Sequence, residues 1–126
     1  MKIGLTTGVY DLFHLGHKNL ILKAATKCDF LLVAVASDWL TTVQKGPMRP
    51  EETERVRQYN VQKFIEDNNI NGKAFITDLL DFSQLEMIDI VILGEDQRNV
   101  RYGNKSTIVI PRTSDISTTK LLSLKI

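Results

Sequence analysis

Seven consecutive apolar residues decide the fold class of this chain: Phe30-Leu31-Leu32-Val33-Ala34-Val35-Ala36. A strand that is apolar on both faces is covered on both sides, as strands of parallel sheets are. Working outward from this run, shorter apolar runs predict further strands at residues 3–7, 73–76, 88–93 and 107–110. Glycine or proline follows each of them except 73–76, which Gly72 precedes.

The segments between these strands have helical spacing. We expect helices at residues 16–27 and 51–67, a short helix from Ser83 to Met87, and a last helix at residues 118–125 with Ser117 as its N-cap. Residues 37–50 read as a polar loop. In the helix at 51–67, the expected apolar side consists of Val56, Tyr59, Phe64 and Ile65.

Strands that alternate with helices indicate parallel βαβ units. The predicted fold class is therefore α/β, a Rossmann-like open parallel sheet with helices on both faces. Sheets of this kind bind ligands at the carboxyl ends of their strands, where the strand order reverses. Every candidate residue below can be tested against that location.

Composition limits the function classes. The 126 residues are enough for one domain, which we expect to span 1–126, and their net charge of +1 argues against a broad nucleic-acid-binding surface. No apolar run approaches the ~20 residues that span a bilayer, so no membrane insertion is expected. With a single cysteine and no signal-peptide pattern after Met1, a cytoplasmic location is expected.

The residues that carry chemistry follow the first strand, in Thr7-Gly8-Val9-Tyr10-Asp11-Leu12-Phe13-His14-Leu15-Gly16-His17. Their glycine spacing fits neither a Walker A loop nor a GxGxxG fingerprint. His14 and His17 stand three residues apart where a helix begins, so both lie on one side of its first turn. Backbone N–H groups are unpaired there and attract anions, and Gly16 lets a phosphate come close. Imidazoles donate hydrogen bonds to phosphate oxygens.

Two other interpretations apply to the same histidines. A pair of this kind also occurs as helix capping, and Asp11, His14 and His17 are a chemically reasonable set of metal ligands. A structural zinc site is not expected, because no fourth histidine or cysteine is near.

Gly8 to His17 resembles the G-x-[FY]-D-x-x-H-x-G-H signature of the cytidylyltransferase branch of the HxGH nucleotidyltransferases. The similarity continues through Lys45-Gly46, Glu54-Arg55 and the strand Asp89 to Asp96, which is similar to DVxxxGxD. It ends at Arg112 to Thr119, similar to R-T-x-G-I-S-T-[TS]. In size and motif order the chain most resembles the glycerol-3-phosphate cytidylyltransferases.

This resemblance implies the HxGH nucleotidyltransferase fold, a homodimer, and transfer of CMP from CTP to a small phosphorylated alcohol, with Mg²⁺ bound to the triphosphate. His14, His17, Lys45 and Arg112 would be catalytic, and Lys45 and Asp38 would contact the acceptor. The implied nucleotide contacts are Gly8, Val9, Tyr10, Asp11, His14, Leu15, Gly16, His17, Arg55, Gly94, Asp96, Arg112, Thr113, Ile116, Ser117, Thr118 and Thr119. Arg57 competes with Arg55 for its place, and no protein ligand is assigned to the metal.

Three positions depart from the pattern. Gln97 follows Gly94-Glu95-Asp96 where an aromatic residue is usual, at the border of the base pocket. Asp115 replaces a glycine, and the Val-Asp pair after the second helix is not evident. The alternatives are phosphocholine or phosphoethanolamine as acceptor, an adenylyltransferase that uses ATP and a sugar phosphate, as Lys45-Gly46-Pro47 suggests, and a nucleotide-binding module without turnover.

Overall fold

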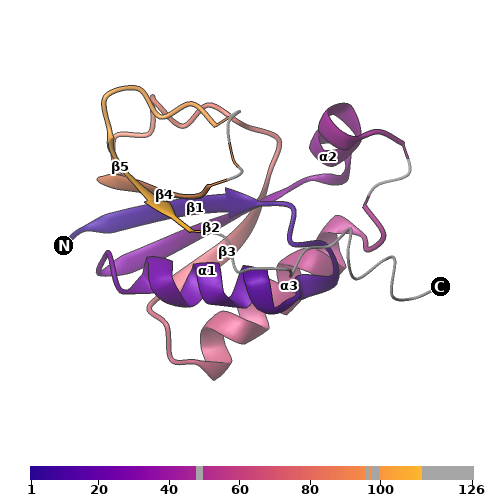
Figure 1. Ribbon diagram of the computed structural model, residues 1–126, viewed down its shortest axis with the longest axis horizontal. Helices are drawn as coiled ribbons and strands as arrows, with labels where there is room; N and C mark the ends of the chain where they lie inside the picture. Colours follow the sequence, from indigo (N-terminus) through magenta and orange to yellow (C-terminus); the bar gives the residue numbers. More distant parts are fainter. Residues whose placement is uncertain (48–49, 96, 98–99, 112–126) are drawn as a thin grey trace.

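The structure is a computed structural model and describes residues 1–47, 50–95, 97 and 100–111. Five parallel strands form one sheet in the order β3-β2-β1-β4-β5 (Figure 1). The strands are β1 (Ile3–Gly8), β2 (Phe30–Ala36), β3 (Gly72–Thr77), β4 (Ile90–Gly94) and β5 (Ser106–Ile110). All five predicted strands are therefore confirmed, and with them the α/β class and its parallel sheet.

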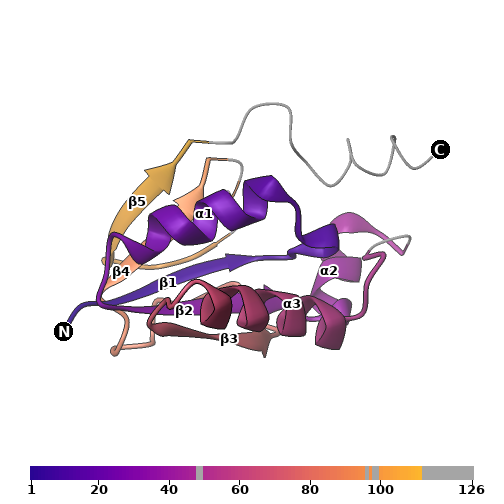
Figure 2. The same cartoon turned by 90° about the horizontal axis from the view of Figure 1, so that it is seen from below.

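Three α-helices and one short 3-10 helix connect the described strands. They are η1 (Asp11–Phe13), α1 (Leu15–Ala25), α2 (Asp38–Lys45) and α3 (Glu54–Asp67). Figure 2 shows α1 and α3 side by side on one face of the sheet. Ile21 and Ala24 of α1 and Val61 and Ile65 of α3 belong to the same core cluster. The cluster also includes the buried residues of β2 and β4 that face these helices.

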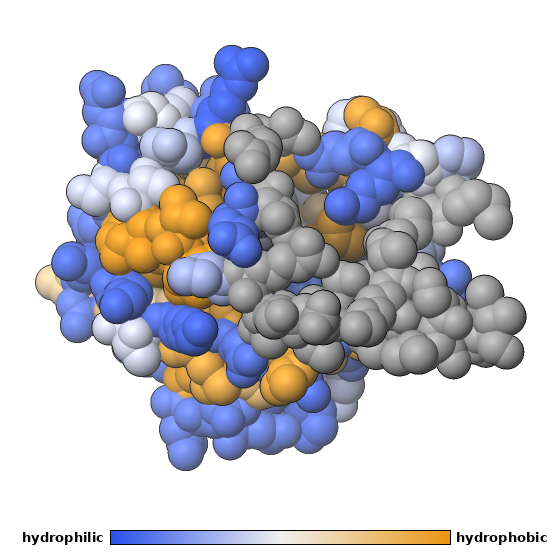
Figure 3. All heavy atoms as spheres, viewed as in Figure 1, coloured by the Kyte–Doolittle hydropathy of each residue, from blue (hydrophilic) through white to orange (hydrophobic). Residues whose placement is uncertain are grey.

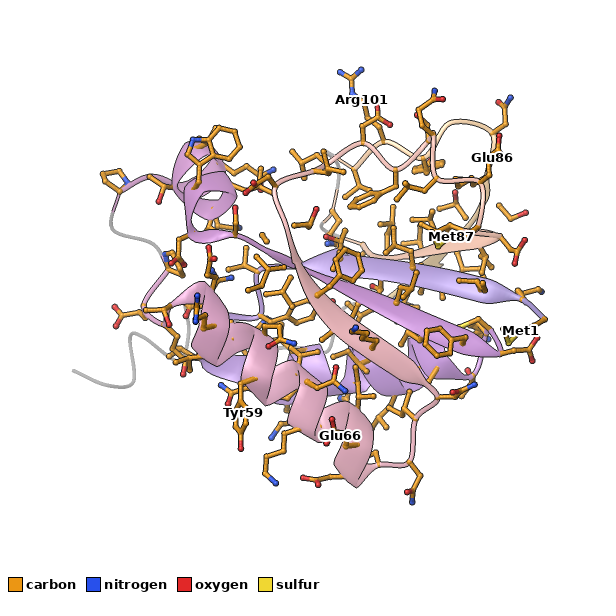
Figure 4. All side chains as sticks on the ribbon, turned by 180° about the vertical axis from the view of Figure 1, so that it is seen from behind. Met1, Tyr59, Glu66, Glu86, Met87 and Arg101 are labelled. Atoms are coloured by element: carbon orange, nitrogen blue, oxygen red, sulfur yellow. The ribbon has the colours of Figure 1, made fainter. Side chains whose placement is uncertain are left out.

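The other face of the sheet is covered by an irregular segment, and no helix of the described residues packs on it. Phe82 and Ile88 are buried there against Leu5, Ala34 and Val91. They belong to an irregular connection between β3 and β4. The connection is held by Phe82 N, which donates to Arg101 O at 2.7 Å, and by Arg101 N, which donates to Leu80 O at 2.8 Å. In Figure 4 the labelled Glu86, Met87 and Arg101 point outward from this layer.

Two predicted elements are corrected in these connections. The predicted helix from Ser83 to Met87 is wrong, because these residues form turns. Ser83 N and Oγ instead donate to Asp81 Oδ1 at 3.0 and 2.6 Å, a local bond that offers the backbone an alternative to a helix. Residues 38–45 form helix α2 where a loop was expected. Ser37 caps it by accepting a hydrogen bond from Leu40 N at 3.1 Å.

Helix α3 begins three residues later than predicted and buries a different set of side chains. Its N-cap is Thr53, and its buried residues are Arg57, Val61 and Ile65. Val56 and Tyr59 are exposed, and Figure 4 shows Tyr59 pointing away from the sheet. The expected apolar side was therefore right for Phe64 and Ile65 and wrong for Val56 and Tyr59.

Trp39 lies on α2 with 63% of its surface exposed. Figure 3 shows hydrophobic side chains gathered over β4 and β5 and hydrophilic ones along the edge where α3 lies. Within the described ranges, no helix has the length and apolar character that crossing a membrane requires.

The strand order reverses between β1 and β4. The chain runs from β1 outward to β2 and β3, then returns to the other side of β1 to form β4 and β5. β1 pairs with β2 along its whole length, to Gly8↔Val35, but pairs with β4 only at Gly4↔Ile90 and Leu5↔Val91. The carboxyl ends of β1 and β4 are therefore not joined by backbone pairing. This is the position at which open α/β sheets bind ligands.

Candidate active site

The turn that follows β1 has a strained backbone. Tyr10, Leu12 and Phe13 have φ angles of 59°, 61° and 23°, in the left-handed region that L-residues with large side chains rarely adopt. Such conformations persist only where the surroundings hold them, and they concentrate at functional sites. Three of them within four residues mark this turn as the candidate site.

The residues before α3 hold this turn in place. Asp11 is buried, and its two carboxylate oxygens accept hydrogen bonds from Glu51 N at 2.9 Å and Glu52 N at 3.0 Å. In return, Glu52 Oε1 accepts a hydrogen bond from Leu12 N at 2.8 Å. The side chain of Asp11 therefore anchors the turn from inside. Nothing in the sequence pattern had indicated that Glu52 takes part.

His14 and His17 form a reciprocal cap at the start of α1. His14 Nδ1 accepts a hydrogen bond from Gly16 N at 3.1 Å, and His17 Nδ1 accepts one from His14 N at 3.2 Å. The two rings stack with their centroids 3.8 Å apart and their planes at 19°. Since Nδ1 of each ring is an acceptor, each neutral ring carries its proton on Nε2. Each histidine then has an Nε2–H group as its donor, the form that binds a phosphate oxygen.

His17 lies among aromatic rings. Its ring meets the edge of Tyr10 at 5.3 Å between centroids and stacks on Phe13 at 6.2 Å. Burial in these surroundings, with His14 beside it, lowers the pKa of His17 from 6.5 to about 3. His17 is therefore a neutral hydrogen-bond donor at physiological pH in the free protein.

The ring of Tyr10 packs against the ring of His17. The Tyr10 ring is buried and packs closely on Gly8, where a Cβ would lie 3.1 Å from the ring and would require the ring to shift by a few tenths of an ångström. Burial raises the pKa of the Tyr10 phenol, and the neighbouring Thr6 hydroxyl opposes that shift. Gly8 and Tyr10 thus shape the turn by packing.

Arg57, and not Arg55, faces the interior at the start of α3. Its guanidinium is fully buried and donates to Val9 O at 2.8 Å, Ala36 O at 2.7 Å, Glu52 O at 2.9 Å and Asp38 Oδ1 at 2.7 Å. It joins the carboxyl ends of β1 and β2 to α2. The predicted acceptor residue Asp38 is thereby fixed in orientation, whereas Arg55 is exposed.

The remaining predicted residues lie around this centre. Lys45 is exposed in the last turn of α2, Leu15 is exposed at the start of α1, and Gly94 ends β4 next to Gln97. Asp96 and the segment with Arg112, Thr113, Ile116, Ser117, Thr118 and Thr119 lie outside the described residues. Their assigned roles, and the last helix, stay predictions.

The described residues do not assemble a metal site of their own. Among them, no group of three or more His, Cys, Asp or Glu side chains is placed to hold a metal ion. Asp11, His14 and His17, the alternative set of metal ligands, are not such a group.

An open parallel sheet with paired, Nε2-protonated histidines at its first strand-to-helix turn defines a protein of the nucleotidyltransferase type. The comparison with known families agrees. The chain belongs to the cytidylyltransferase-like family, whose model matches residues 5–123. The resemblance to the HxGH superfamily is therefore confirmed.

Two of the curated relatives have different names. The chain is 34% identical over 94 residues, 75% of its length, to phosphopantetheine adenylyltransferase of Clostridium perfringens, and this covers 54% of that protein. It is 30% identical over 97 residues to the bifunctional protein HldE of a Caulobacter species. The chain spans only 16% of that HldE protein.

Solved structures share the fold. The lipopolysaccharide core biosynthesis protein from Thermoplasma volcanium superposes with a TM-score of 0.69 at 24% identity, over 90% of this chain and 99% of that one. A protein from Archaeoglobus fulgidus, described as of unknown function, superposes with a TM-score of 0.67 at 16% identity, over 87% of this chain and 89% of that one.

Proposed function

We propose that this protein transfers a nucleoside monophosphate from a nucleoside triphosphate to the phosphate of a small phosphorylated acceptor. The observation that carries the proposal is the reciprocal cap of His14 and His17, which commits both Nδ1 atoms to the backbone and leaves Nε2–H as the donor of each ring. Membership of the cytidylyltransferase-like family supports it.

In the proposed reaction, an acceptor phosphate oxygen attacks the α-phosphorus of the triphosphate. A new P–O bond forms as the bond to the bridging oxygen breaks, and pyrophosphate leaves with the electron pair. The protein's task is to position the two reactants and to stabilise the charge on the phosphate oxygens. Donors already fixed in place cost no reorganisation during the reaction, which is what the cap of His14 and His17 provides. Mg²⁺ would arrive with the triphosphate and neutralise part of its charge.

Two versions of the reaction are supported by different observations. The sequence similarity and the family favour CTP with glycerol 3-phosphate, or with phosphocholine or phosphoethanolamine as related acceptors. The name of the phosphopantetheine adenylyltransferase relative favours ATP with another phosphorylated acceptor, such as a sugar phosphate. Lys45, on the side of β2 and α2, would hold the acceptor phosphate in either version.

Pyrophosphate release tests the proposal. The protein is incubated with Mg²⁺ and each of CTP, ATP, UTP and GTP, crossed with glycerol 3-phosphate, phosphocholine, phosphoethanolamine, phosphopantetheine and several sugar phosphates. Release that requires both one triphosphate and one acceptor supports nucleotidyl transfer and identifies both substrates. If triphosphates raise the melting temperature but no acceptor gives release, the transfer reaction is wrong for every acceptor tested, which leaves a binding module or an acceptor outside the panel.

A homodimer is part of the proposal. Trp39 and Val43 lie one turn apart on α2 and are both largely exposed. Large apolar side chains at such positions are common in interfaces. Sedimentation equilibrium of the protein and of Trp39→Lys tests whether these residues hold two copies together.

A further inference from the structure

Gln97 joins the separated ends of β1 and β4. Its Oε1 accepts a hydrogen bond from Gly94 N at 2.9 Å, and its Nε2 donates to Thr7 O. A tight turn brings the residue back to the strand end, with Gln97 N donating to Gly94 O at 3.1 Å. A single carboxamide thus satisfies one backbone acceptor of β1 and one backbone donor of β4.

Thr7 O and Gly94 N lie at the position where open α/β sheets bind their ligands. β1 and β4 stop pairing after Leu5 and Val91, so their carboxyl ends border the crevice at which the strand order reverses. Thr7 is followed directly by the turn that leads to His14 and His17. A Cβ on Gly94 would be in ordinary contact with Gln97 Oε1, at 3.8 Å.

The hydrogen-bonding groups of the Gln97 carboxamide resemble one edge of a nucleotide base. It presents an NH₂ donor and an oxygen acceptor on one carbon. Adenine and cytosine present an NH₂ donor and a ring-nitrogen acceptor, likewise on one carbon. Uracil and guanine carry the opposite pattern at this edge, a carbonyl acceptor next to an N–H donor. Placed here, they would leave Thr7 O facing an acceptor and Gly94 N–H facing a donor.

We propose that the Gln97 carboxamide occupies the base-edge position of the free protein, and that an amino base, adenine or cytosine, displaces it to bind Thr7 O and Gly94 N–H. This inference rests on the proposed function and deepens it. It assigns the discrimination between amino and keto bases to two backbone groups, and it makes Gln97 an internal competitor of the nucleotide.

Equilibrium binding of CTP, ATP, UTP and GTP with Mg²⁺ tests the inference, with tripolyphosphate as a probe that has no base. CTP or ATP should bind about tenfold more tightly than UTP and GTP, because the keto bases leave both backbone groups unpaired. Gln97→Met keeps the length of the side chain but removes its hydrogen bonds. It should tighten binding of the preferred triphosphate about threefold or more and leave tripolyphosphate binding unchanged.

Gln62→Met is the matched control. Its carboxamide also bonds to a strand backbone, accepting from Ala74 N at 2.8 Å, but on the edge strand β3, which is separated from β1 by β2. This variant should bind all four triphosphates as the unmodified protein does. The side-chain NH₂ signals of Gln97, assigned by their loss in Gln97→Met, should shift with the preferred triphosphate and stay in place with tripolyphosphate.

Three results would overturn the inference while the proposed function stands. Equal affinity for all four triphosphates would show that Thr7 O and Gly94 N–H do not select amino bases. Weaker or unchanged CTP and ATP binding by Gln97→Met would show that Gln97 reads the base or only staples the strands. Unmoved Gln97 signals in the bound protein would exclude displacement. By contrast, a failure of every triphosphate and of tripolyphosphate to bind would refute the proposed function as well.

Discussion

At the scale of single residues, the backbone determines what His14 and His17 offer to a ligand. An isolated imidazole exchanges its proton between two nitrogens, but here each Nδ1 is an acceptor for a backbone N–H at the start of α1. The stacked rings, 3.8 Å between centroids, share one environment. The sequence predicted the pair and its position on one side of the first turn. It did not predict the reciprocal cap, so capping and phosphate binding are compatible roles of the same residues.

Replacing either histidine with asparagine separates these two roles. Asparagine Oδ1 can accept the backbone N–H that Nδ1 accepts, but no group replaces Nε2–H. We expect His17→Asn to lower kcat about 100-fold or more, with the melting temperature nearly unchanged, and His14→Asn to behave similarly. Lys23→Ala, on the exposed surface of the same helix, is the control and should keep full activity. Near-normal turnover in His17→Asn would remove His17 from the mechanism.

The depressed pKa of His17 predicts a pH dependence of stability. In the unfolded chain His17 takes up a proton near its ordinary pKa of 6.5, whereas in the folded protein it does so only near 3. The unfolded state therefore binds more protons between these values, and the free energy of unfolding falls as the pH drops from about 6.5 toward 3. Above pH 7 this contribution is constant. Urea unfolding at pH 8, 6 and 4.5 should show a smaller fall for His17→Asn than for the unmodified protein, and equal falls would contradict the shifted pKa.

At the scale of elements, the start of α3 shows an arginine in a position that an apolar residue usually fills. Arg57, Val61 and Ile65 follow one another at helical spacing, and all three are buried. Removing the guanidinium would leave the carbonyl oxygens of Val9 and Ala36 without their donor. We expect Arg57→Met to lower the free energy of unfolding by about 2 to 4 kcal/mol in urea titrations.

Arg55→Met is the natural comparison for Arg57→Met. Arg55 is exposed, so its loss should change the free energy of unfolding by less than about 0.5 kcal/mol. If Arg55 contacts the nucleotide as the resemblance implies, the variant should instead raise the KM for the triphosphate. An unchanged KM in a fully stable Arg55→Met protein would show that the sequence similarity placed the arginine wrongly.

The elements that the sequence predicted correctly are those with a dominant local signal. Five apolar runs gave five strands, three of them followed by glycine or proline, because a buried strand needs little beyond such a run. Helix α2 escaped prediction because its eight residues bury only Leu40 and Thr41. The buried side of α3 was misjudged because a charged residue begins it. Arg57 is tolerated there because four acceptors surround it, three of them from distant segments, and such long-range partners leave no local pattern.

At the scale of the whole molecule, the candidate site is divided by β1. Gln97 and Gly94 lie on the β4 side, Asp38 and Lys45 on the side of β2, and the two histidines follow β1 between them (Figure 1). Sequence similarity predicted most of these residues. It did not predict that Gln97 joins β1 to β4, because that contact depends on two strands ceasing to pair.

This division predicts that the two halves of the site act independently. Lys45→Ala should raise the KM for the acceptor more than the KM for the triphosphate, since its exposed ammonium is proposed to hold the acceptor phosphate. Gln97→Met should change only triphosphate affinity. Side chains on opposite sides of β1, with no partner in common, should have effects that add as free energies. The fold-change in kcat/KM of the double variant should then equal the product of the fold-changes of the two single variants. A large departure from this product would mean that the acceptor site and the base site are coupled through a shared element. An effect of Lys45→Ala confined to the triphosphate would place the acceptor site elsewhere.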